Sequence, residues 1–169
     1  MTDNVKIPKK YKSWNGISTE IKKLGINVED SFILNPNLTD LRDRTIEFIL
    51  DKENISRRSL EAFFKFLQQD PNRIASHSIF EKDDKIVGHS LTVRTRWDPN
   101  IGSMSFVNTS EQNSQNLREL LIGKTVLECK LTNINMIEIY IREDVFELSK
   151  RFTPHGFKFR NILSFESIS

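Results

Sequence analysis

Cysteine is almost absent from this chain: Cys129 is the only one in 169 residues. A disulfide framework is therefore excluded, and a reducing, cytoplasmic setting is expected. Histidine is scarce too, because His77, His89 and His155 are the only three and stand far apart, with none at the spacing of metal ligands. We therefore expect no metal centre of the Cys/His type.

Long hydrophobic runs are also missing. No apolar stretch approaches the roughly 20 residues that a membrane-spanning helix needs. The segment MTDNVKIPKKYK has no apolar part of the kind found in signal peptides. An excess of one charge is missing as well, because the formal net charge is only +2. This balance argues against a dedicated nucleic-acid-binding protein, although the lysines of residues 1–14 leave a local contact open.

The chain nevertheless has enough apolar material for one core. Hydrophobic residues make up 37% of it, and 12 residues are phenylalanine. The cleanest helical signal follows Asn54, where four apolar residues recur at the spacing of one helix face: Leu60, Phe63, Phe64 and Leu67. We expect this face to be buried in the core.

Residues 18–50 carry weaker signals. They predict a helix from Ser18 that ends at Gly25 as a C-cap, and a second helix that is capped by Thr39. A short apolar strand is predicted between them in DSFILNPNLTD, where Asn35-Pro36 stops it.

The pattern then alternates between apolar and polar residues. SHSIFEKDDKIVGHSLTVRTRW predicts two strands around a tight turn at Asp83-Asp84, and IGSMSFVN predicts a third strand. A helix over about 116–131, a strand in MIEIYI, a helix in EDVFELSKRF and a strand in GFKFRNILSFE follow. Hairpins favour antiparallel pairs, and a strand–helix–strand crossover favours a parallel pair. We therefore predict an α/β (α+β) fold with a mixed, mostly antiparallel sheet flanked by helices.

The loop and helix after the third strand read SEQNSQNLRELL, and a later segment reads SKRFTPHGF. In their order and spacing these elements resemble the GNAT acyltransferase superfamily over about residues 31–166. The resemblance implies an acyltransferase domain at 31–169 and an N-terminal extension at 1–30. The extension has three open roles: to cover the acceptor site, to form a dimer contact or to wrap the back of the domain.

In that family a loop of the form Arg/Gln-x-x-Gly-x-Gly/Ala and the next helix start hold the CoA pyrophosphate. Here Gln112 matches the first position, while Gln115 and Leu117 stand where small residues are expected. Asparagine tolerates positive φ, so Asn113 and Asn116 are candidates for the bends that glycine would make. The site that the resemblance implies for acetyl-CoA, or another acyl-CoA, comprises Phe106, Val107, Gln112, Asn113, Ser114, Gln115, Asn116, Leu117, Arg118 and Phe152.

No catalytic residue is assigned from the sequence. The resemblance places Phe152 at a Tyr that protonates the leaving thiolate in many members, and Val145 at a position that is often Asn. Attack by an amine needs a base, and the thioester carbonyl needs hydrogen-bond donors. Residues that offer such groups also have a plainer interpretation as surface or packed residues: Ser103, Ser105, Glu111, Glu138, Tyr140, His89, His155 and Cys129.

The sequence thus predicts an N-acyltransferase that moves an acetyl group from acetyl-CoA to a small-molecule or protein amine. The alternative is a catalytically weak or inactive GNAT-like protein that senses CoA or contacts another protein, because the loop glycines and the Tyr are replaced. A small nucleic-acid-associated protein is a third hypothesis, and it rests on the lysines of residues 1–14. We expect no membrane contact, and a homodimer remains open.

Overall fold

The structure is a computed structural model, and it describes residues 9–110 and 114–139. Within these ranges the helices are α1 (Trp14–Lys23), α2 (Thr39–Lys52), α3 (Arg57–Gln69) and α4 (Ser114–Leu131), with the short 3-10 helices η1 (Lys9–Tyr11) and η2 (Pro71–Arg73). The strands are β1 (Asn27–Glu29), β2 (Ile74–Lys82), β3 (Lys85–Arg94), β4 (Ile101–Thr109) and β5 (Met136–Glu138). The helix expected at 143–152 and the strand expected at 156–166 lie outside the described residues.

The strands form one sheet in the order β1-β2-β3-β4-β5. The first four are antiparallel neighbours, and β4 and β5 are parallel, joined by the crossover helix α4. The predicted mixed, mostly antiparallel sheet is confirmed, as is the predicted parallel pairing of the strands on either side of α4.

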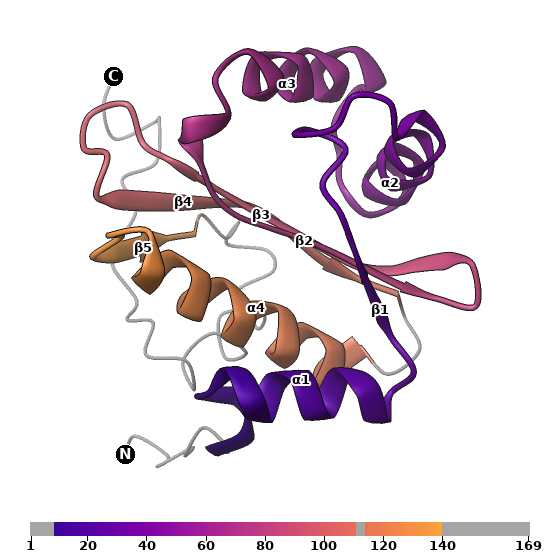
Figure 1. Ribbon diagram of the computed structural model, residues 1–169. Coiled ribbons are helices and arrows are strands. Elements are labelled where there is room, and N and C mark those ends of the chain that lie inside the picture. Colours follow the sequence, from indigo (N-terminus) through magenta and orange to yellow (C-terminus); the bar gives the residue numbers. More distant parts are fainter. Residues whose placement is uncertain (1–8, 111–113, 140–169) are drawn as a thin grey trace.

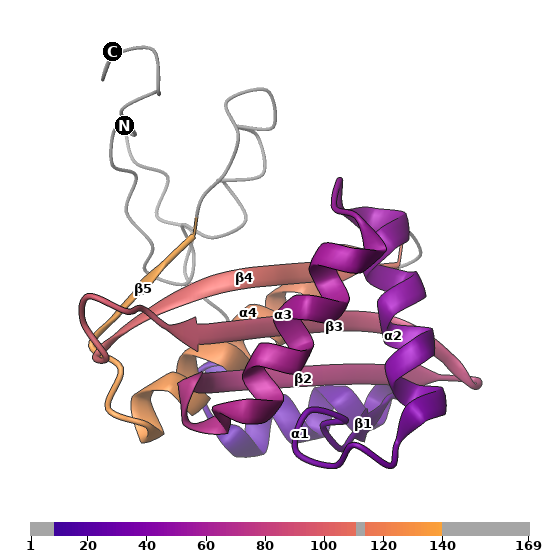
Figure 2. The same ribbon diagram turned by 90° about the horizontal axis from the view of Figure 1, so that it is seen from above.

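Helices cover both faces of this sheet (Figures 1 and 2). Helices α2 and α3 lie on one face, above an aromatic-rich core that contains Phe32, Ile46, Leu60, Phe64, Leu91 and Phe106. Helices α1 and α4 lie on the other face, where the buried residues include Ile17, Phe80, Leu117, Leu120 and Leu121. The predicted stripe on α3 is buried at Leu60, Phe64 and Leu67, while Phe63 is partly buried.

Helix α1 corrects one sequence-based boundary. It begins at Trp14, before the predicted start at Ser18, because Ser13 caps it with Oγ accepting from the backbone N–H of Gly16 at 3.1 Å. Its end was predicted correctly. Gly25 has φ +68°, and the backbone N–H of Ile26 donates to Ile21 O at 3.1 Å, as in a Schellman cap.

The predicted strand in DSFILNPNLTD is wrong. Residues 32–34 form a turn, and the strand is β1, before that segment. Phe32 and Ile33 are buried all the same, so burial alone produced the apolar signal. Thr39 is also not a cap: it is the first residue of α2, and the N-cap Leu38 has no side-chain hydrogen bond.

The turn at Asp83-Asp84 is confirmed. Both residues have positive φ, 51° and 60°, as a two-residue turn of the primed type requires. Helix α4 starts two residues before the predicted position near Asn116 and ends at Leu131 as predicted.

Residues 9–26 pack against the sheet face that α4 covers. Tyr11 is 4% exposed, and its carbonyl oxygen would lie 3.0 Å from a Cβ added at Gly123 in α4, so glycine permits this close approach. Helix α1 and α4 lie side by side in both views (Figures 1 and 2). Among the described residues, no helix is long and apolar enough to cross a membrane.

Candidate functional site

The two edges of β4 are paired very differently. Its β3 edge is paired from Gly102 opposite Arg94 to Thr109 opposite Gly88. Its β5 edge is paired only from Ile101 to Ser103 among the described residues. Strands β4 and β5 therefore part after Ser103, and within the described residues the rest of the β5-facing edge of β4 has no strand beside it.

A β-bulge lies where the strands part. Leu91 pairs with Phe106 and the next residue, Thr92, pairs with Met104, so Ser105 has no register partner on β3. A bulge bends its strand and increases the local twist. The bulge at Ser105 thus gives a local reason for β4 to turn away from β5.

Three residues form a row across the sheet at this point. Val93 on β3 pairs with Ser103 on β4, which pairs with Glu138 on β5. Ile137 and Ile139 pack with Met104 and Ile122 on the α4 side, so Glu138 between them faces the side of α2 and α3. Ser103 and Glu138, both candidates from the sequence, are therefore brought together where the strands part.

The start of α4 lies beyond the end of β4, after Thr109. The first N–H groups of a helix have no partners inside the helix and attract anions. Leu117 is 5% exposed and packs with Ile17 and Phe80, so its side chain points into the core. Asn116 in the same turn is exposed. The side chain of Leu117 therefore does not stand in the space in front of the helix.

The remaining residues of the predicted cofactor site are distributed as follows. Phe106 is buried under α3, 6.0 Å from the ring of Phe63, while Val107 packs on the α4 side. Arg118 is half-buried in the first turns of α4. Ser114 and Gln115 belong to α4. Gln112, Asn113 and Phe152 lie outside the described residues, as do Glu111, Tyr140, Val145 and His155.

The structure corrects the expectation that the histidines lie far apart, because His77 and His89 are in contact. Nε2 of His77 lies 2.9 Å from Nε2 of His89, and Nδ1 of His77 lies 2.9 Å from Ser31 Oγ. His89 is fully buried, and its Nδ1 has no hydrogen-bond partner among the described residues. Burial lowers the pKa of His77 to about 3 and lowers the pKa of His89 well below its usual value, so both rings are neutral at pH 7.

This pair arises from the hairpin register, which a bulge between Phe80 and Glu81 shifts by one residue. The bulge could not be seen in the sequence. Among the described residues no group of three or more metal-ligating side chains is present. Because His89 is enclosed and lies away from the row at Ser103, we do not assign it a catalytic role.

Cys129 is buried, as the sequence indicated. Burial raises the pKa of its thiol to about 12, so it is a neutral thiol at pH 7. A neutral buried thiol is a poor nucleophile.

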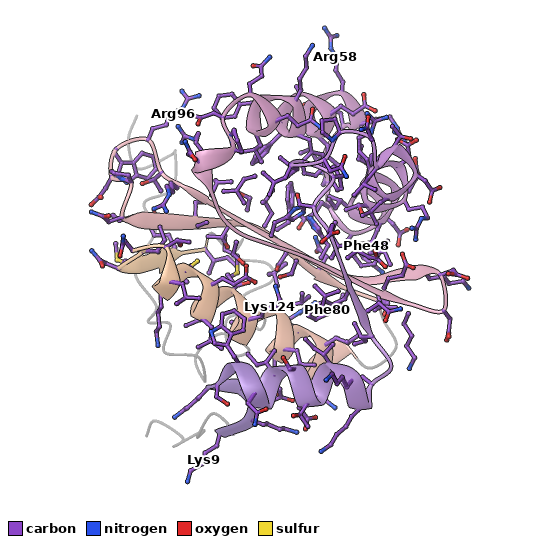
Figure 3. The ribbon with its side chains drawn as sticks, viewed as in Figure 1. Lys9, Phe48, Arg58, Phe80, Arg96 and Lys124 are labelled. Atoms are coloured by element: carbon purple, nitrogen blue, oxygen red, sulfur yellow. The ribbon has the colours of Figure 1, made fainter. Side chains whose placement is uncertain are left out.

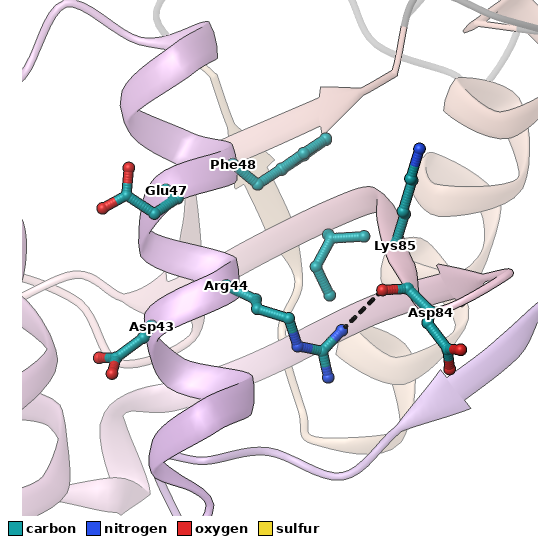
Figure 4. A pocket seen from close by; sticks show the side chains of 7 residues that line it. Asp43, Arg44, Glu47, Phe48, Asp84 and Lys85 are labelled. Atoms are coloured by element: carbon teal, nitrogen blue, oxygen red, sulfur yellow. Dashed lines mark hydrogen bonds between the residues drawn. The ribbon is translucent and has the colours of Figure 1, made fainter.

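Two shallow hollows mark the described surface. One, of about 460 Å³, is lined by Asp43, Arg44, Glu47, Phe48, Asp84, Lys85 and Ile86 (Figure 4). It lies at the β2–β3 turn, and Arg44 there donates to Glu81 Oε2 at 2.6 Å and to Asp84 O at 3.4 Å. The arginine that lines this hollow is therefore already paired with a carboxylate.

The second hollow lies between α3 and the end of β3. It measures about 430 Å³ and is lined by Ser59, Ala62, Phe63, Phe66, Leu67, Arg73 and Val93. Val93 belongs to the row that leads to Ser103 and Glu138. Sequence reasoning missed this groove, because the stripe on α3 was interpreted only as core. The partial exposure of Phe63 and Phe66 depends on where the other elements end.

The comparisons with known proteins agree with this architecture. No family model and no curated protein matches the chain. Solved structures do match. An acetyltransferase of the GNAT family from Staphylococcus aureus has a TM-score of 0.59 at 16% identity, over 79% of this chain and 84% of that one. A predicted acetyltransferase from Clostridium acetobutylicum, solved with acetyl-CoA, has 0.58 at 16%, over 82% and 94%.

Glucosamine-6-phosphate N-acetyltransferase from Arabidopsis thaliana is similar to the same degree, with a TM-score of 0.56 at 14% identity over 82% of this chain and 95% of that one. Identities this low establish the fold and leave the reaction open. The chain therefore has the fold of the GNAT acetyltransferases.

Proposed function

We propose that the protein is an N-acyltransferase that transfers an acetyl group from acetyl-CoA, or another acyl group from its CoA thioester, to an amine. The observation that carries this proposal is the opening between β4 and β5, with the start of α4 beyond the end of β4. An open strand edge and a helix start offer backbone donors to one extended, phosphate-bearing molecule.

The cofactor fits this edge in two parts. The pantetheine arm contains amide groups. The edge of β4 near Phe106 and Val107, which has no strand beside it in the described part of the chain, can bind them as it would bind an added strand. The pyrophosphate belongs at the backbone from Asn113 to Leu117, where helix N–H groups and the helix dipole favour an anion. The inward packing of Leu117 supports this placement, since a leucine side chain in that space would exclude phosphate.

The reaction needs a base and donors beside the thioester. The amine nitrogen attacks the thioester carbonyl, an amide bond forms, and the C–S bond breaks to release CoA thiolate. Glu138 faces the opening on the side of α2 and α3, where it can take the proton that the amine loses. Backbone N–H groups along the open edge of β4 can stabilise the carbonyl oxygen as negative charge develops.

This scheme has no assigned side chain that donates a proton to the leaving thiolate. The resemblance places Phe152 where many family members have Tyr, and a phenyl ring cannot donate a proton. We therefore expect transfer to be slow, or to depend on water or another side chain for that proton. The same replacement, with the glycine-free loop, favours the second candidate function: a GNAT-like protein that binds CoA or another protein without turnover.

A thermal-shift titration tests the proposal directly. Acetyl-CoA, CoA and longer acyl-CoAs are added in turn, and a ligand that binds only the folded protein must raise the melting temperature. We expect acetyl-CoA to do so. A wild-type protein whose melting temperature no CoA species changes has lost the cofactor site, and the proposal fails.

The variant Phe152→Tyr separates the two candidate functions. It should leave the thermal shift nearly unchanged and raise the release of free CoA thiol in the presence of an amine. If both proteins bind acetyl-CoA and neither releases thiol with any amine, the chain is a CoA-binding protein rather than a transferase.

A further inference from the structure

The groove between α3 and β3 is lined by Arg73, and Arg96 lies beside it near the ring of Phe66. The Arg73 guanidinium lies 5.5 Å from the centre of the Phe66 ring, and the Arg96 guanidinium lies 5.8 Å from the same centre. Arg73 donates to Arg94 O at 2.8 Å, which fixes its position. Among the described residues, neither guanidinium forms an ion pair with a carboxylate.

Three other arginines of the described chain form ion pairs with carboxylates. Arg42 contacts Asp43, Arg44 contacts Asp40 and Glu81, and Arg57 contacts Glu47 and Glu61. Arg94 is used for structure, because it donates to the carbonyl oxygens of Asn72, Pro99 and Thr132 at 2.8 to 3.1 Å. Both guanidiniums lie near one ring, at 5.5 and 5.8 Å from its centre, so an anion bound beside that ring is attracted by both charges.

The floor beside these charges is apolar. Phe63, Phe66, Leu67 and Val93 line the groove, and Trp97, next to Arg96 in the chain, is 70% exposed. A volume of about 430 Å³ is within the range that small ligands occupy. The groove thus offers an apolar surface with a doubly positive rim.

The groove also faces the proposed reaction. Its residue Val93 pairs with Ser103, and Ser103 pairs with Glu138, so the groove and the proposed base lie on one face of the sheet. A molecule in the groove can extend an amine across β4 toward the place where β4 and β5 part.

We propose that this groove, defined by Phe66, Arg73, Arg96 and Val93, binds the acyl acceptor, and that the acceptor is an amine with an apolar body and an anionic group. The role as acceptor site rests on the proposed function. Carboxylate and phosphate are both suited to a pair of guanidiniums. A nucleic-acid strand would also use arginine and aromatic groups, but the net charge of +2 and the small size of the groove favour the small amine.

Three amines separate these features: tyramine, which has a ring and no anion; O-phosphotyramine, which adds a phosphate; and tyrosine, which adds a carboxylate. Their affinities for the full chain are measured by isothermal titration, with and without acetyl-CoA. We expect at least one anionic amine to bind about 10-fold more tightly than tyramine, since charge-assisted hydrogen bonds are the strong ones. Which of the two binds more tightly identifies the anion.

The test variant is Arg96→Glu, and the matched control is Arg58→Glu. Both positions are exposed, but Arg96 lies toward the β3–β4 turn while Arg58 projects outward from α3 (Figure 3). Arg96→Glu should abolish the preference for the anionic amine, and Arg58→Glu should keep it. If both variants lose the preference for the anionic amine to the same extent, only the overall charge matters, and the groove is not the binding site.

Failure of this inference can be told from failure of the proposed function. If acetyl-CoA raises the melting temperature but wild type shows no preference for anionic amines, the groove does not select the acceptor. If the preference exists but no CoA species binds, the anion site stands and its role as acceptor site is overturned. If poly(U) displaces the anionic amine and binds more tightly, the surface is a nucleic-acid site instead.

Discussion

The two edges of β4 differ in how far they are paired and in how deeply the neighbouring side chains are buried. On the β3 edge the pairing spans nearly the whole strand, and the buried core beneath α2 and α3 combines aliphatic side chains with phenylalanine rings. On the β5 edge the described pairing covers residues 101–103 alone, and the residues of β5 are half-buried. One edge thus holds the fold together, and the other is the edge at which we propose that the ligand binds.

The largest effect is expected when apolar side chains on the strands beside the two edges of β4 are truncated and the free energy of unfolding is compared. Leu91 on β3 is fully buried opposite Phe106, and Leu91→Ala should lower the free energy of unfolding by about 3–5 kcal/mol. Ile137 on β5 is half-buried, so Ile137→Ala should cost about 1 kcal/mol. Urea unfolding of both variants measures this difference, and similar losses would show that the β5 edge is as important for stability as the β3 edge.

Removal of the proposed base should affect the rate and leave the fold intact. Glu138→Gln keeps the size of the side chain and removes its ability to accept a proton, so kcat/KM for acyl transfer should fall about 100-fold. Release of CoA thiol measures the rate, and a thermal-shift titration checks that acetyl-CoA still binds. The control is Glu29→Gln on β1, at the far side of the sheet, which should leave the rate unchanged. Equal activity of Glu138→Gln and wild type would exclude Glu138 as the base.

The buried pair of histidines, His77 and His89, should also make the free energy of unfolding depend on pH. The pKa values of His77 and His89 are lowered by burial, while those of unfolded histidines are about 6.5. Below pH 6.5 the unfolded chain therefore binds protons that the folded chain does not, and stability falls as the pH falls toward 3.

Between pH 7.5 and pH 5.0 we expect each of the two histidines to contribute a loss of about 2 kcal/mol in the free energy of unfolding, measured by urea unfolding at the two pH values. The double variant His77→Gln/His89→Gln should be less stable at pH 7.5 and should lose most of this pH dependence. An unchanged pH dependence in the double variant would assign the effect to other groups.

The sequence predicted the elements that are defined by local pattern. The turn at Asp83-Asp84, the buried stripe of α3 and the parallel pair around α4 depend on residues that are close in the sequence or on a chain-order rule. The misplaced first strand has the opposite cause. Phe32 and Ile33 are buried by helices and strands far along the chain, and local sequence cannot tell a buried turn from a buried strand.

The candidate site could be predicted only in part for the same reason. The resemblance located the end of β4 and the start of α4, which are adjacent in sequence. The contact of His77 with His89 depends on a bulge, and the groove depends on α3, η2 and the β3–β4 turn meeting in space. Phe66, Arg73 and Arg96 carry no common motif, so only the folded structure shows that they share a surface.

The smallest expected effect concerns the open edge itself. Asn116 is exposed in the first turn of α4, and Asn116→Asp places a carboxylate where the proposed pyrophosphate lies. Repulsion between exposed charges a few ångströms apart is worth about 1 kcal/mol, so the affinity for acetyl-CoA should fall about fivefold. The fall should shrink as salt is added, because salt screens exposed charges.

The same substitution should not weaken the fold, because an aspartate in the first turn of a helix interacts favourably with the helix dipole. The melting temperature without ligand should therefore stay level or rise slightly, which separates lost binding from lost structure. Asn54→Asp, an equal change of charge between α2 and α3, is the control and should leave the affinity for acetyl-CoA unchanged. If both variants bind acetyl-CoA as wild type does, the phosphates do not lie at the start of α4, and the open edge of β4 must hold its ligand in another way.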